Sequence, residues 1–172
     1  MNTTIVLSIL SDDHPGIVKS LSRLLSSHGG NWTESSMLSL AGKFAGVLLA
    51  SLPGEEADAF IEGLGALEKE GMQIIAQRSG VLSVADKQNE FTLDLVGQDH
   101  PGIVHDITRI LASHGINVLE LETHCQSASM SGESLFLAHA RLMAPADVST
   151  SALQDDLEEL ANELMVDIKL ED

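Results

Sequence analysis

The sequence is poor in cysteine and in aromatic residues. Its 172 residues include one cysteine, one tryptophan, four phenylalanines and no tyrosine. A single cysteine excludes an intrachain disulfide, which fits a reducing compartment, and it excludes metal-carrier domains that use paired cysteines. Because no His or Asn stands near it in a recognisable nucleophile signature, Cys125 is expected to be a thiol packed within a strand.

Basic residues are scarce as well. Nine lysines and arginines stand against 26 aspartates and glutamates, and the formal net charge is −17. Affinity for nucleic acid comes largely from counterions that Lys and Arg release, and anionic membranes also attract basic segments. The composition therefore argues against direct contact with DNA, RNA or a membrane surface. It leaves room for a basic protein partner.

Long apolar runs are lacking too. The apolar stretch Thr4–Leu10 is interrupted at Ser8, is followed by Ser11-Asp12-Asp13 and has no basic start, so it does not resemble a signal peptide. No stretch approaches the roughly 20 apolar residues that a membrane-spanning helix needs. The expected location is the cytoplasm.

What the sequence does contain is an internal repeat. The six residues Asp13–Val18 recur unchanged as Asp99–Val104, 86 residues later. The same offset pairs Ser27–Gly29 with Ser113–Gly115, Asn31 with Asn117, and Glu34 with Glu120. A repeat of this length indicates a duplicated folding unit. We expect a first domain over residues 1–80, a linker over 81–89 and a second domain over 90–172.

Each repeat predicts the order strand, helix, two strands, helix, strand. Apolar residues alternate or cluster in the strands and recur every three to four positions in the helices. The elements expected in the first repeat are Thr4–Leu10, a helix between Pro15 and His28, Asn31–Leu40, Lys43–Leu52, a helix around Phe60–Leu67, and Met72–Arg78. Those of the second are Glu90–Gly97, a helix between Pro101 and His114, Ile116–Ser127, Ser134–Met143, a helix around Leu153–Leu164, and Met165–Leu170, with a longer hairpin tip at Ala128–Gly132.

This βαββαβ order is that of the ferredoxin-like fold, in the α+β class. We therefore expect two tandem ferredoxin-like units, each a four-stranded antiparallel sheet with both helices on one face. The strand after the first helix lies at a sheet edge in this fold. An exposed edge can pair with another copy, so a homo-oligomer is expected.

The fold hosts many functions, so a site must decide between them. RNA-recognition modules of this topology need stacking aromatic residues and a basic surface, which this chain lacks. Neither a pair of catalytic carboxylates nor a Ser, His and Asp set is recognisable, so no enzyme, no cofactor and no metal site is predicted. Four histidines are expected at helix ends or in strands and not as ligands: His28, His114, His124 and His139.

The candidate site is the start of the first helix in each repeat. Backbone amides of a first helical turn lack partners within the helix, and the helix dipole favours an anion there. A neighbouring Asp can accept from an ammonium group, and an Asn at the start of the next strand can donate and accept. These groups suit the carboxylate and the ammonium of an amino acid. The candidate ligand-binding residues are Asp13, His14, Pro15, Gly16, Ile17, Asn31, Asp99, His100, Pro101, Gly102, Ile103 and Asn117.

A purely structural interpretation of the same motif stays open. Pro is favoured at the first position of a helix. Asp-His-Pro-Gly also suits a tight corner between strand and helix, with a side chain as the N-terminal cap. His14 and His100 would then be capping or packing residues. An Asp-His pair could also hold a metal ion, but no third ligand is indicated.

The order strand, Asp-His-Pro-Gly-Ile-Val, helix and Gly-x-Asn resembles the ACT domain family of small-molecule regulatory modules over nearly the whole chain. The tandem arrangement resembles the glycine cleavage system transcriptional repressors. The resemblance implies that an amino acid binds where the loop before the first helix of one unit faces the start of the next strand in a neighbouring unit. Serine-binding members have a histidine four residues before the proline, where this chain has Ser11 and Gly97.

The resemblance implies a regulator that is not an enzyme. A small amino acid such as glycine or serine would modulate its contact with a transcription activator, and so the transcription of glycine cleavage genes. Two other functions stay open. One is an accessory or allosteric subunit of an enzyme of amino-acid metabolism, and the other is a structural module that oligomerises through its sheet edge.

Overall fold

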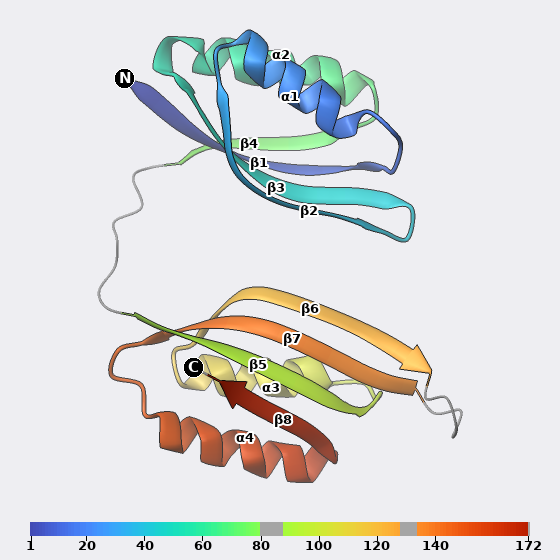
Figure 1. Ribbon diagram of the computed structural model, residues 1–172, viewed down its shortest axis with the longest axis vertical. Helices are drawn as coiled ribbons and strands as arrows, with labels where there is room; N and C mark the ends of the chain where they lie inside the picture. The colour runs from blue at the N-terminus through green and yellow to red at the C-terminus, as the bar shows by residue number, and fades with distance from the viewer. Residues whose placement is uncertain (80–87, 128–133, 172) are drawn as a thin grey trace. The chain divides into compact units, whose positions relative to one another are not determined.

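The computed structural model describes residues 1–79, 88–127 and 134–171, and the chain divides into two compact units, Met1–Ser83 and Val84–Asp172 (Figure 1). The elements of the first unit are β1 (Asn2–Asp12), α1 (Ile17–Ser27), β2 (Asn31–Leu40), β3 (Lys43–Pro53), the short 3-10 helix η1 (Gly54–Glu56), α2 (Ala57–Lys69) and β4 (Gln73–Ser79). Those of the second are β5 (Gln88–Gln98), α3 (Ile103–Ser113), β6 (Asn117–Ser127), β7 (Ser134–Pro145), α4 (Thr150–Leu164) and β8 (Val166–Glu171).

Each unit is a four-stranded antiparallel sheet with two α-helices on one face (Figure 1). The strand orders are β2-β3-β1-β4 and β6-β7-β5-β8. The two tandem ferredoxin-like βαββαβ units of the α+β class are therefore confirmed, as is the edge position of β2 and β6. None of the helices α1 to α4 combines the length and the apolar composition that a membrane crossing requires, within the described ranges.

Two expected segments fall partly or wholly beyond what the structure describes. β5 begins at Gln88, so residues 88 and 89 of the expected linker belong to a strand. The remainder of that linker, residues 81–87, lies outside the described residues. The expected hairpin tip at residues 128–132 does so as well.

The two units have separate cores built from equivalent positions. In the first, β1 buries every second residue and α1 every fourth: Ile5, Leu7, Ile9, Ile17, Leu21 and Leu25. In the second, β5 and α3 do the same with Phe91, Leu93, Leu95, Ile103, Ile107 and Leu111. Val18 and Val104 are exposed, although both are apolar. Each follows a buried isoleucine by one position, and that step turns the side chain about 100° around the helix axis.

The first helix of each unit ends as the sequence predicts. His28 is the C-terminal cap of α1, and Gly29 follows it in the left-handed region with φ 66°. The amide of Gly30 donates to the carbonyl of Leu25, and the amide of Gly29 to that of Ser26. This pair of bonds is the Schellman motif, which needs a residue tolerant of positive φ. α3 ends in the same way at His114 and Gly115.

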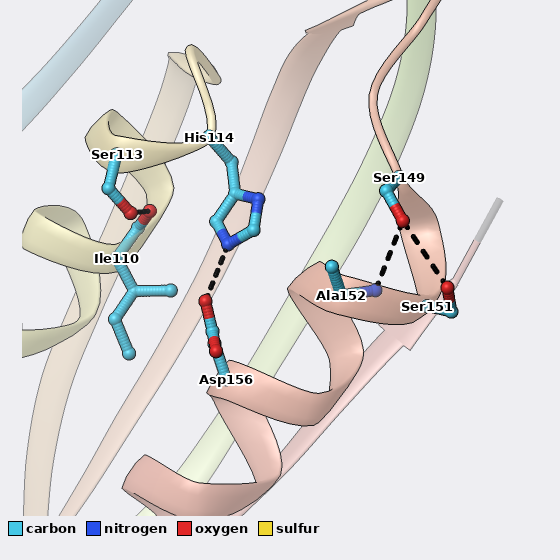
Figure 2. A network of polar contacts seen from close by, with 7 residues as sticks. All are labelled: Ile110, Ser113, His114, Ser149, Ser151, Ala152 and Asp156. Carbon is cyan, nitrogen blue, oxygen red and sulfur yellow. Dashed lines mark hydrogen bonds and ion pairs between the residues drawn. The ribbon is translucent and has the colours of Figure 1, made fainter.

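In each unit a histidine at the end of the first helix pairs with a carboxylate in the second helix or just before it. At the end of α1, His28 Nδ1 lies 2.8 Å from Glu56 Oε2, just before α2. At the end of α3, His114 Nε2 lies 2.7 Å from Asp156 Oδ2, within α4 (Figure 2). The expectation that both histidines lie at helix ends is confirmed. The equivalent histidines reach carboxylates from different sequence positions, and they do so through different ring nitrogens.

Candidate functional site

The helix starts at Ile17 and Ile103, and not at the preceding prolines. Gly16 has φ 107° and ψ −7°, and Gly102 has φ 102° and ψ −13°. A proline followed by a glycine with positive φ is typical of a type II turn. The expectation that Pro15 opens the helix is therefore wrong, because the left-handed glycine separates the proline from the first helical residue.

The first turns of α1 and α3 have no side-chain cap. The amide of Ser20 makes a 2.9 Å bond to the Gly16 carbonyl, so the amides before it precede the helical ladder. α4 is different, since Ser149 Oγ accepts a 3.3 Å hydrogen bond from the Ala152 amide (Figure 2). The N-cap residue of α1 and of α3 is a glycine, which has no side chain to cap the helix. The interpretation in which a side chain of the motif caps the helix is therefore wrong.

The predicted loop residues lie at the surface around these amides. Asp13, His14, Pro15 and Gly16 are exposed. Ile17 is buried in the core, so only its backbone amide is available to a ligand. In the second unit Asp99, Pro101 and Gly102 are exposed, His100 is half-buried and Ile103 is buried.

The carboxylate of Asp13 is oriented by the end of β2. Ser39 Oγ donates a 2.6 Å hydrogen bond to Asp13 Oδ2, and the Asp13 amide donates to the Gly42 carbonyl at 2.9 Å. A carboxylate has about four acceptor sites, so Asp13 can accept further donors. The neighbouring Asp12 pairs with Lys43, whose hydrogen bond and charge hold the pKa of the Asp12 carboxyl below its usual value.

In the second unit Cys125 occupies the place of Ser39. The Asp99 amide donates to the Ser134 carbonyl at 2.8 Å, and the Cys125 thiol lies beside the Asp99 carboxylate. Partial desolvation, followed by the charge and hydrogen bond of Asp99, raises the pKa of this thiol. Cys125 is exposed, so the expectation of a packed strand thiol is wrong. β6 is an edge strand with only β7 beside it, and the Cys125 side chain is open to solvent there.

The two loop histidines adopt the same arrangement. His14 Nδ1 lies 3.2 Å from the Pro15 carbonyl oxygen, and His100 Nδ1 lies 3.2 Å from that of Pro101. Because a carbonyl only accepts, this contact is a hydrogen bond in the tautomer whose Nδ1 atom carries the hydrogen. The contact holds each imidazole against its own turn.

Asn31 and Asn117 lie at the opposite end of the sheet from the loop of their own unit. Asn31 pairs with Ser51, which pairs with Thr4 near the beginning of β1. Asp12, beside the loop, lies eight residues further along β1, which corresponds to about 26 Å at the rise of a strand. The second unit repeats this placement, because Asn117 pairs with Met143 and Met143 with Glu90. The sequence analysis grouped the loop residues and the asparagines in one candidate site, but no single unit brings loop and asparagine together. A site that uses both needs a loop and an asparagine from different units.

The positions four residues before each proline are closed to a larger side chain. Ser11 is buried, and its hydroxyl donates to the Asp12 carbonyl at 2.6 Å. A Cβ atom at Gly97 would lie 2.2 Å from Val166 Cγ1. The side chain of Val166, on the neighbouring strand β8, therefore fills the space beside this glycine. The sequence shows that histidine is absent there, but only the packing shows that Gly97 has no room for one.

No three His, Cys, Asp or Glu side chains come together as a metal site requires, among the residues whose placement is described. His124 lies in β6 and His139 in β7, so the expectation of strand histidines is confirmed. His139 Nδ1 lies 2.7 Å from Asp94 Oδ1 on the neighbouring strand. Sequence reasoning missed Ser39 and Cys125 as neighbours of the loop. The offset of 86 residues pairs them, and that signal could have found them.

Comparison with known proteins agrees with this architecture. The family model of the ACT domain matches twice, over residues 3–76 and 90–171. A solved structure of an unknown protein from Galdieria sulphuraria is 31% identical, with a TM-score of 0.90 over 99% of this chain and 98% of that one. A candidate glycine cleavage system transcriptional repressor of known structure is 18% identical, with a TM-score of 0.69 over 99% of this chain and 96% of that one. No curated protein sequence matches the chain.

The chain is thus a tandem of two ferredoxin-like units, each with a left-handed glycine after the proline that precedes its first helix. The chain belongs to the ACT domain family, in both of its units. ACT domains are regulatory modules that typically bind amino acids.

Proposed function

We propose that this protein is a non-enzymatic, cytoplasmic regulator that senses a small amino acid, glycine or a serine-like one, at the loops before α1 and α3. It modulates transcription of glycine cleavage genes through a protein partner. The observation that carries the proposal is the uncapped first helical turn beside an oriented, exposed carboxylate in a chain made of two ACT units.

The chemistry of the loop matches the two charges of an amino acid. The first-turn amides and the helix dipole favour the ligand carboxylate. The Asp13 carboxylate, held by Ser39, accepts hydrogen bonds from the ligand ammonium. Asn31 or Asn117 of another unit adds a carboxamide that can donate to one group and accept from the other. A ligand held by two units stabilises one arrangement of them, and this is how binding would reach a partner.

The first loop is the stronger candidate of the two. α1 has no acidic residue in its first turn, whereas α3 has Asp106. Asp106 Oδ2 lies 3.6 Å from where a Cβ on Gly102 would be, so this carboxylate stands at the helix mouth. A carboxylate at a helix N-terminus already interacts favourably with the dipole. It would also repel the carboxylate of an incoming ligand, so we propose tighter binding at Asp13–Gly16 than at Asp99–Gly102.

Binding can be tested by titration calorimetry of the full chain with glycine, serine, alanine and leucine. We expect saturable binding of a small amino acid, weakened at least about tenfold in Asp13→Ala and in Asn31→Ala, since each removes a charge-assisted or polar contact. Asn162→Ala is the control, because Asn162 is exposed on α4 in the second unit and is none of the candidate ligand-binding residues. If the protein is folded and no amino acid gives detectable heat of binding, the sensing proposal is wrong.

The proposed route through a protein partner is supported by charge. A net charge of −17 opposes direct contact with DNA, whereas a basic surface on a transcription activator would attract this chain. We propose the glycine cleavage genes as the target because the candidate repressor of known structure shares the two-unit architecture. Purified activator of these genes should bind the immobilised protein with an affinity that changes when the amino acid is added. Binding of an enzyme of amino-acid metabolism in its place would favour the accessory-subunit alternative.

A further inference from the structure

The two sheets differ on the face turned away from their helices. In a strand pair, directly paired residues share a face, and successive residues along a strand point to opposite faces, so every second residue lies on the same face. In the first unit the middle row across this helix-distal face is Ser36, Val47, Ser8 and Ile75. The next row is Leu38, Ala45, Leu10 and Gln73. Neither row contains an ionisable side chain.

Large apolar side chains gather on this face of the first unit. Twelve large hydrophobic residues are exposed in the described part of the chain, and five of them lie here. Their exposed fractions are 43% for Leu10, 55% for Leu38, 71% for Leu40, 49% for Val47 and 64% for Ile75. They come from all four strands of one sheet and form a contiguous patch, and such patches mark interaction sites. Charges stand at its margins, where Lys43 pairs with Asp12 at one end and Glu34 lies at the other.

The equivalent face of the second unit is charged. Its middle row is Glu122, His139, Asp94 and Lys169. The row on one side of it is Glu120, Arg141, Thr92 and Glu171. The row on the other side, equivalent to that of Leu10, is His124, Leu137, Val96 and Asp167. These side chains form ion pairs on the face itself, between His139 and Asp94, Arg141 and Glu120, and Lys169 and Glu171. The two units therefore share a backbone, but the middle row and the next row contain no ionisable side chain in the first unit, whereas each of these rows contains some in the second.

We propose that the helix-distal face of the first sheet is a self-association surface, which pairs with the same face of a second copy of this chain. Two sheets pack face to face when both faces are apolar, as in a sandwich. The charged face of the second unit is a poor occupant, because its ion pairs would lose water against leucine and valine.

The charge of the chain restricts where two copies can meet. Each copy carries a net charge of −17, so two copies repel over most of their surface. The patch is where they can meet without opposing carboxylates in its central rows. Four strands about 4.8 Å apart and about seven residues long cover roughly 19 Å by 23 Å. This is about 440 Å² on each copy, below the range of stable specific interfaces and in that of weak ones, so the dimer should dissociate on dilution.

The test is sedimentation velocity of the full chain from about 1 µM to about 200 µM, the range in which a small interface dissociates. We expect the mass to rise from that of an 18.3 kDa monomer toward twice that value. Leu10→Glu should weaken the dimer at least about tenfold, because it places two carboxylates in one apolar interface. Val96→Glu is the matched control, since Val96 occupies the equivalent position of the second unit and is 41% exposed.

Each remaining outcome overturns the proposal. A wild-type chain that stays monomeric at the highest concentration does not use this face for a second copy. If Leu10→Glu and Val96→Glu weaken the dimer equally, either the interface lies elsewhere or the added charge alone causes the effect. Ile75→Glu, on a different strand of the same patch, must reproduce the effect of Leu10→Glu. Far-UV circular dichroism identifies any variant that fails to fold, and the other patch variant then decides.

Discussion

Ser39 donates a hydrogen bond to Asp13 in the first unit, and the residue 86 positions after Ser39 is Cys125, beside Asp99 in the second. A hydroxyl is a strong donor and a thiol a weak one. The two loops therefore hold equivalent carboxylates by contacts of different strength. The second loop also has an acidic residue, Asp106, in the first turn of its helix, and the first loop does not. The two loops therefore differ in two ways.

The Cys125 thiol should react slowly for an exposed cysteine. Desolvation and the Asp99 charge raise its pKa, and the thiolate is the reactive form. We expect Asp99→Asn to lower the pKa of the thiol and to speed alkylation by iodoacetamide at about pH 8, because a negative charge is removed. Asp155→Asn, on the exposed side of α4, should leave the rate unchanged. An unchanged rate in Asp99→Asn would show that the carboxylate does not control this thiol.

Gly16→Ala and Gly102→Ala should each lower the free energy of unfolding by about 1–2 kcal/mol, since an L side chain is strained at positive φ. Space is not the cause, because a Cβ at Gly16 would meet no atom within 4 Å. Gly65→Ala is the control. It also has open space, but it lies within α2 without a positive φ, so it should stabilise by about 0.5–1 kcal/mol. Urea unfolding measures all three.

The His139–Asp94 pair should make stability depend on pH. The hydrogen bond and charge of Asp94 raise the pKa of His139 above its ordinary value. A group with a raised folded pKa adds stability that is fully present below the unfolded pKa of about 6.5, and is lost as pH rises through the folded pKa. NMR titration of the imidazole protons should show the raised pKa, and Asp94→Asn should lower it. An unchanged His139 titration in Asp94→Asn would contradict this assignment. High salt should reduce the difference, because the pair is exposed.

Leu142→Ala should destabilise the second unit by about 2–5 kcal/mol, because Leu142 is fully buried in the second core. The two cores share no residue, so amide hydrogen exchange in α1 and β1 should stay as in the parent. Leu119→Ala, at an exposed position in β6, should have little effect on either unit. Equal loss of protection in both units after Leu142→Ala would contradict independent units.

Much of the fold could be predicted because it is encoded in local periodicity. The alternation in β1 and the four-residue spacing in α1 follow from backbone geometry. The Schellman ends at Gly29 and Gly115 depend on one residue type each. The turn before α1 was predicted less well, because Pro-Gly is compatible with both a helix start and a type II turn. The left-handed φ of Gly16 distinguishes them only once the chain has folded.

The candidate site was predicted as a set of residues but not as an arrangement. A motif shows which groups lie near each other along the chain, so it placed Asp13, Gly16 and the first-turn amides together. It could not show that Asn31 lies about 26 Å away in the same unit, because that distance depends on strand direction and register.

By itself, the sequence determined the duplication, the order of elements and the acidic surface, because repeats, periodicity and charge are properties of the chain. Tertiary structure alone decided that Ser39 holds Asp13, that Val166 closes the space at Gly97, and that the two sheets differ so sharply on one face. These contacts join residues far apart in sequence. Their physical basis is strand pairing, which puts distant side chains in one row and fixes the chemistry that a surface presents.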